Sequence, residues 1–103
     1  MTKITNGLPA IHPGKFLLEI LTEIGLSQAQ FARNIGVSAM RVSHVINGTR
    51  PVTAELAHLI GKAFGQSPQY WMNLQVDYDL KTVARALKPQ IENVRRLEAL
   101  AAS

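Results

Sequence analysis

The polar side chains that could do chemistry in this chain are concentrated between Ser38 and Arg50. Arginine can donate to O6 and N7 of guanine, serine and histidine can bond to a base edge, and alanine or methionine can touch a thymine methyl group. Short polar or basic side chains also suit phosphate oxygens. The residues predicted to contact duplex DNA are Gln28, Ser38, Ala39, Met40, Arg41, Ser43, His44, Asn47, Thr49 and Arg50.

A helix over residues 39 to 47 would bring the base-contacting candidates to one face. Val42 and Val45 are three residues apart and apolar, so we expect them to point into a core. The 3.6-residue period then turns the polar positions outward, with Arg41 at the margin. Two of them have an ordinary alternative: Met40 as a packing residue and His44 as a surface histidine. Phosphate contacts are expected from Gln28, Asn47, Thr49 and Arg50.

A second helix must hold the first one against DNA, and the sequence predicts a helix-turn-helix over residues 28 to 47. Ser27 and Gln30 have the spacing of a capping box, so a helix is expected from 28 to about 35. Gly36 can take a positive φ beyond its end, and Ser38 can cap the next helix. Ala32 is a small residue where the two helices approach. Together these positions favour DNA binding by the second helix of the pair.

Three more helices are expected around this motif, from residue 13 to 24, from 54 to 64 and from 68 to about 87. Pro13, Thr53 and Ser67 with Pro68 mark their starts. Pro89 should break or kink the chain, and Ile91, Val94, Leu97 and Ala101 form an apolar stripe on one last helix. We therefore expect an all-α protein with an arm over 1–12, a five-helix DNA-binding domain over 13–80, and a helical extension over 81–103.

The composition restricts the other functional classes. There are 11 Lys and Arg against 7 Asp and Glu, with none of the acidic residues between Glu23 and Glu55, so that window is expected to face a polyanion. Cysteine is absent, which excludes disulfides and thiolate sites and favours a reducing cytoplasm. His12, His44 and His58 fall on separate elements, so no metal site is predicted. We predict no enzyme, no cofactor, no small-molecule ligand and no membrane segment.

A dimer is expected because one helix-turn-helix contacts only a few base pairs. The segment from 70 to 87 has more apolar surface than a small core needs, and we predict that it self-associates. The alternative is that its aromatic side chains simply close the core. The residues predicted to form the dimer are Tyr70, Trp71, Leu74 and Tyr78.

Several strings resemble the HigA (VapI-like) antitoxins over about residues 11 to 81. They are His12-Pro13-Gly14, Leu26-Ser27-Gln28, Asn47-Gly48-Thr49-Arg50 and, most diagnostic, Ser67-Pro68-Gln69-Tyr70-Trp71-Met72-Asn73-Leu74-Gln75 with Tyr78-Asp79-Leu80. The resemblance implies a lambda-repressor-like fold of the XRE/Cro class. It implies a bacterial type II antitoxin that neutralises a HigB-like, RelE-type mRNA-cleaving toxin and represses its own promoter by binding a palindromic operator as a homodimer. Ala39 and Met40 stand where related repressors often carry polar base-contacting residues.

Two other functions are compatible with the sequence. One is a free-standing transcriptional repressor of the same class without a toxin partner. The other is a helix-turn-helix that serves only as a protein-binding scaffold. Co-purification with the product of the neighbouring gene distinguishes the first from an antitoxin, and binding to the protein's own upstream DNA excludes the second.

Overall fold

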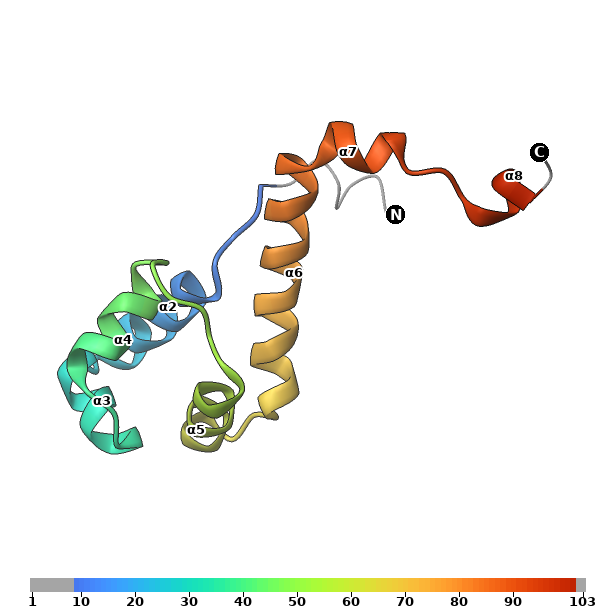
Figure 1. Ribbon diagram of the computed structural model, residues 1–103. Coiled ribbons are helices and arrows are strands. Elements are labelled where there is room, and N and C mark those ends of the chain that lie inside the picture. Colours follow the sequence, from blue (N-terminus) through green and yellow to red (C-terminus); the bar gives the residue numbers. More distant parts are fainter. Residues whose placement is uncertain (1–8, 102–103) are drawn as a thin grey trace.

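A computed structural model of the chain describes residues 9 to 101, which form helices and no strands (Figure 1). The helices are α2 (Pro13–Ile24), α3 (Gln28–Ile35), α4 (Ala39–Ile46), α5 (Ala54–Phe64), α6 (Pro68–Ala86), α7 (Lys88–Asn93) and α8 (Leu97–Ala101). The predicted all-α class with five helices in the body, α2 to α6, is confirmed. Most of the predicted N-terminal arm, residues 1 to 8, lies outside the described residues.

The turn between α3 and α4 forms as its local sequence predicts. The Ser27 hydroxyl accepts from the Gln30 amide at 3.1 Å, and the Gln30 side chain accepts from the Ser27 amide at 2.9 Å. Gly36 ends α3 with φ of 78°, where a side chain would be strained. Ser38 then caps α4 by accepting from the Arg41 amide at 3.1 Å. The helix-turn-helix is thus fixed by short-range hydrogen bonds at each helix end.

The core lies among α2, α3, α4, α5 and α6. Phe31 of α3 stacks on Phe64 of α5 with ring centroids 5.3 Å apart, and Phe64 in turn meets Trp71 of α6. Trp71 is 0% exposed. The buried apolar residues are Leu17, Leu21, Phe31, Ala32, Val42, Val45, Ile46, Val52, Leu56, Ala57, Ile60 and Trp71. Every helix of the five-helix body contributes to this cluster or packs on it, so α4 is held from several sides.

Helix α2 meets α4 backbone to backbone at Gly14. A Cβ atom at this position would lie 1.8 Å from the Val45 carbonyl oxygen, far inside any van der Waals contact. Only glycine therefore permits the observed separation of the two helices. Together with the burial of Val42 and Val45, this contact sets how far α4 stands out from the body.

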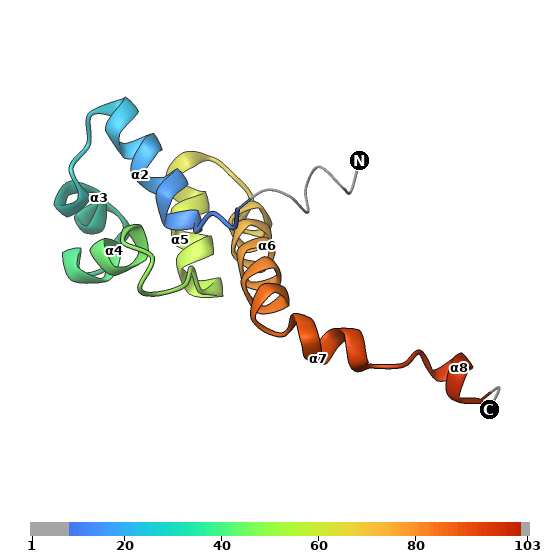
Figure 2. The same ribbon diagram turned by 90° about the horizontal axis from the view of Figure 1, so that it is seen from above.

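The C-terminal part leaves the body, as two views of the ribbon show (Figures 1 and 2). Helix α6 runs without interruption through the predicted boundary at residues 80 and 81. Pro89 lies in the first turn of α7, as its missing amide hydrogen allows. The single last helix predicted from the stripe of Ile91, Val94, Leu97 and Ala101 is wrong, because Val94 is extended with ψ of 126° and separates α7 from α8. In the described part, no helix combines the length and the apolarity needed to cross a bilayer.

Candidate nucleic-acid interface

The outward face of α4 is the centre of the candidate site. Val42 is 2% exposed and Val45 is 1% exposed, which confirms their prediction as inward anchors. On the opposite side, Met40 is 67% exposed and Ala39 is also exposed. Helix α4 therefore has one side buried in the core and one side available to a partner. The other predicted residues on it are half-buried or exposed, namely Arg41, Ser43, His44 and Asn47.

A shallow depression on this surface brings together residues predicted from two separate segments. It is lined by Ser38, Met40, Arg41, His44 and Arg50. The first four belong to α4 or its cap, and the fifth belongs to the loop that follows the helix. We call the outward face of α4 with this depression the α4 surface. Its residues are of the types that contact base edges and phosphates.

The loop after α4 is fastened to the end of the helix. The amides of Thr49 and Arg50 both donate to the His44 carbonyl, at 3.0 and 3.2 Å, and the Thr49 hydroxyl donates to it at 3.1 Å. The Asn47 side-chain amide donates to the Ser43 hydroxyl at 3.4 Å. The hydroxyl proton of Thr49 is therefore engaged within the loop. Arg50 is exposed and its guanidinium is the basic group that this loop offers.

Gln28 and Ser38 lie at the amino ends of α3 and α4. Gln28 is the first residue of α3 and is half-buried, and Ser38 is the exposed cap of α4. Helix amino ends carry unpaired N–H groups and a positive partial charge, which favour phosphate. Both residues are thus in the chemical setting that their predicted contacts require.

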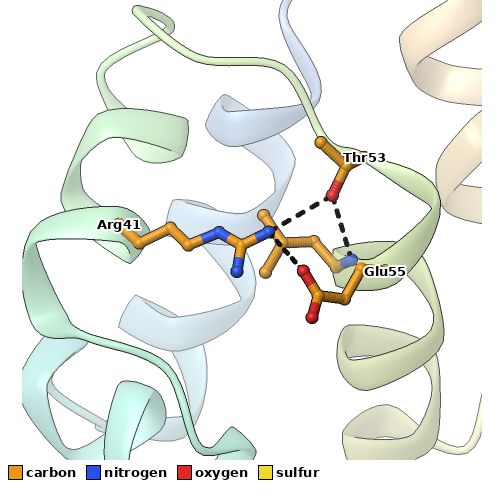
Figure 3. A network of polar contacts seen from close by, with 4 residues as sticks. Arg41, Thr53 and Glu55 are labelled. Carbon is orange, nitrogen blue, oxygen red and sulfur yellow. Dashed lines mark hydrogen bonds and ion pairs between the residues drawn. The ribbon is translucent and has the colours of Figure 1, made fainter.

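Arg41 has a partner that the sequence did not indicate. Its Nη2 group donates to Oε1 of Glu55 at 2.8 Å and to the Thr53 hydroxyl at 3.4 Å (Figure 3). The sequence between Glu23 and Glu55 has no acidic residues, but folding brings the Glu55 carboxylate next to Arg41, which lies within that stretch. The expectation of a surface without a negative charge beside Arg41 is therefore wrong. A pair 14 residues apart on different helices leaves no periodic signal.

The four residues predicted to form the dimer differ in how far the structure buries them. The prediction that Trp71 lies at a dimer interface is wrong, because its side chain is fully buried in the monomer. Its Nε1 donates to Oε1 of Gln66 at 2.7 Å. Tyr70 is exposed, whereas Leu74 and Tyr78 are half-buried against the body. Further along, three apolar side chains of α6 and that of its C-cap Leu87 are also at least 41% exposed, the three being Val76, Leu80 and Val83. We call these four residues the α6 stripe. Their spacing of four, three and four residues was the signal that could have identified them.

No group of three His, Asp or Glu side chains in residues 9 to 101 is arranged to hold a metal ion.

Comparison with known proteins agrees with this geometry. The helix-turn-helix family model matches residues 17–71. Virulence-associated protein I of Dichelobacter nodosus is 40% identical over 77 residues, which are 74% of this chain and 71% of that protein. An addiction module antidote protein of the HigA family from Coxiella burnetii is 35% identical, with a TM-score of 0.84 over 86% of this chain and 99% of that one. The Pseudomonas aeruginosa antitoxin HigA, solved with the higBA promoter, is 39% identical, with a TM-score of 0.82 over 85% of this chain and 98% of that one. The chain belongs to the helix-turn-helix family, among its HigA-type antitoxins.

Proposed function

We propose that this protein is an antitoxin that binds operator DNA through the α4 surface and represses the promoter of its own toxin and antitoxin genes. The observation that carries the proposal is the anchoring of Val42 and Val45, which presents Met40 and its neighbours outward. The HigA relative from Pseudomonas aeruginosa was solved with the higBA promoter and shares the fold over nearly its whole length. The family consists of DNA-binding regulators and not of enzymes.

Different residues of the α4 surface and its surroundings suit base contacts and phosphate contacts. Ala39 and Met40 are exposed and apolar, so they suit the methyl groups of thymine in the major groove. Arg41 offers a guanidinium for a guanine, and Ser43 and His44 offer polar atoms on the same face. Arg50 and the helix amino end at Gln28 suit phosphates on either side. Sequence preference would therefore come from α4, and affinity that depends on salt from its surroundings.

A homodimer on a palindromic operator is part of the proposal. The α6 stripe has the three-and-four spacing of a helix seam, and α6 extends beyond the body (Figure 1). Two copies joined along it would form a two-fold symmetric pair. Two α4 surfaces would then meet half-sites about 34 Å apart, one turn of the duplex.

The proposal includes a protein partner, a HigB-like toxin of the RelE type, and a bacterial cytoplasmic location. Its support is that relatives of high coverage are described as antitoxin and antidote proteins. The alternative is a repressor without a toxin. Co-expression with the neighbouring gene followed by co-purification decides between them, because only an antitoxin retains a small basic partner.

The DNA-binding part is tested with a duplex from upstream of the protein's own gene. Met40→Glu places a carboxylate on the α4 surface without touching the core, and we expect it to weaken binding by about tenfold or more. Leu97→Glu is the matched control, because Leu97 is 80% exposed on α8, outside the five-helix body. Equal binding by wild type and Met40→Glu at low salt would contradict the proposal. Absence of any binding by the wild type would instead favour the scaffold function.

A further inference from the structure

The ion pair between Arg41 and Glu55 joins the DNA-facing helix α4 to the first turn of α5. Glu55 and Thr53 both accept from Nη2 of Arg41, at 2.8 and 3.4 Å. Among the described residues these are the hydrogen bonds of the Arg41 side chain. A guanidinium has five N–H donors, so Nη1 and Nε keep theirs. In Figure 3 the dashed lines from the guanidinium leave from one terminal nitrogen, and the other carries none.

The acceptor side of this pair is held in place by the fold. Thr53 is the N-cap of α5, and its hydroxyl oxygen also accepts from the Leu56 amide at 3.2 Å. Leu56 is buried in the core, so the start of α5 is tied to the body. An arginine held on such an anchor has fewer rotamers to lose when it binds a partner. The anchor therefore prepares Arg41 before any contact with DNA.

Folding stability does not account for the pair. The Arg41 side chain is 35% exposed and that of Glu55 is 69% exposed, and exposed ion pairs contribute little to stability. A carboxylate beside a DNA-binding surface also repels phosphate. Its presence here calls for a benefit in binding, because a surface built only for affinity would omit it.

We propose that Glu55, with Thr53, is a positioning residue that holds Arg41 for a guanine in the operator. The pair engages Nη2 of Arg41 and leaves the N–H groups of Nη1 for an acceptor on a base edge in the major groove. Arg41 lies in the shallow depression with Ser38 and His44, on the α4 surface. Glu55 thus acts on sequence preference through Arg41 and not by touching DNA. This inference rests on the function proposed above.

The test uses Glu55→Gln, Arg41→Ala and the double variant, with affinities for the operator, for operators carrying single G·C to A·T changes, and for unrelated DNA. We expect Glu55→Gln to lower the ratio of operator to unrelated affinity by about fivefold or more. The loss should concentrate at one G·C pair of each half-site. In the Arg41→Ala background the same change should leave the ratio unaltered. Glu19→Gln is the charge-matched control, since Glu19 is exposed on α2.

Four outcomes overturn the inference. Glu55→Gln could raise affinity for all DNA with the ratio unchanged, which would make Glu55 only a repulsive charge. It could also lower the ratio equally with and without Arg41, or lower affinity equally at every base pair, as loss of a phosphate contact would. A wild-type protein that shows no preference for its operator would remove the proposed function itself, and this inference with it.

Discussion

The imidazole ring of His12 lies edge-on against the phenol ring of Tyr78, with ring centroids 4.9 Å apart and planes inclined by 72°. The same histidine caps α2, since its Nδ1 accepts from the Gly14 amide at 2.9 Å. One side chain thus joins the start of α2 to the middle of α6. The cap requires Nδ1 to be unprotonated, because a protonated imidazole has no acceptor.

We predict that acid weakens the fold through His12. Partial burial lowers the pKa of His12 below its ordinary value of 6.5, against the opposing effects of the Arg50 backbone and the Asp79 charge. As pH falls below 6.5, the unfolded chain takes up this proton before the folded one, so stability is full above that pH and declines through the folded pKa. Urea unfolding between pH 7.5 and pH 5 should show a steeper loss in wild type than in His12→Asn, because asparagine also caps but does not titrate. Parallel losses in the two proteins would contradict the prediction.

Gly14→Ala should destabilise the protein strongly. The added methyl group would fall 1.8 Å from the Val45 carbonyl oxygen, so α2 and α4 must separate. We expect a loss of about 2 kcal/mol or more in the free energy of unfolding. Gly25→Ala is the control, because Gly25 has φ of 73° but no atom within 4 Å of the added Cβ, and it should cost only about 1 kcal/mol. Equal losses of unfolding free energy for the two variants in chemical denaturation would show that the close approach of α2 to α4 does not limit stability.

We predict that removing the side-chain amide of Gln75 lowers the free energy of unfolding. It is 4% exposed; its Oε1 accepts from the Val52 amide at 2.7 Å and its Nε2 donates to Asp79 at 2.9 Å. Gln75→Leu leaves a buried N–H unpaired, and we expect a cost of about 1 to 3 kcal/mol in urea unfolding. The control is Gln69→Leu, which removes a similar bond to Asn73 on the exposed side of α6 and should cost less than about 0.5 kcal/mol. A small effect at both sites would mean that the Val52 amide finds another acceptor.

The α6 stripe should govern self-association. Leu80→Asp with Val83→Asp places two charges on exposed positions, so the monomer should keep its helical content while the dimer dissociates. Light scattering coupled to size exclusion measures the mass directly. Operator binding should weaken together with the loss of the dimer. A double variant that stays dimeric would show that the dimer interface lies outside the α6 stripe. Leu97→Asp is the control that tests whether any added charge dissociates the dimer.

Local features were predictable from the sequence because their causes are local. The capping box of Ser27 and Gln30 and the positive φ of Gly36 involve residues within a turn of one another. The inward orientation of Val42 and Val45 followed from helical periodicity alone. The outward orientation of Ala39 and Met40 was therefore predictable, and their contact with DNA stays a prediction.

What the sequence could not predict depends on tertiary position. Arg41 and Glu55 meet only because the fold brings the start of α5 beside the Arg41 side chain. The burial of Trp71 depends on its ring contact with Phe64 and its hydrogen bond to Gln66, which composition does not reveal. The break at Val94 lies in a segment without buried residues, where an apolar stripe is no evidence of one continuous helix.

The close approach of Gly14 to the Val45 carbonyl has an evolutionary consequence. The constraint falls on the backbone of α4 and on its inner side, so positions such as Ala39, Met40 and Ser43 carry no part of it. Substitutions there can accumulate at little cost to folding. Related chains built on this scaffold can therefore differ in their exposed α4 side chains, while the architecture that carries these side chains stays the same.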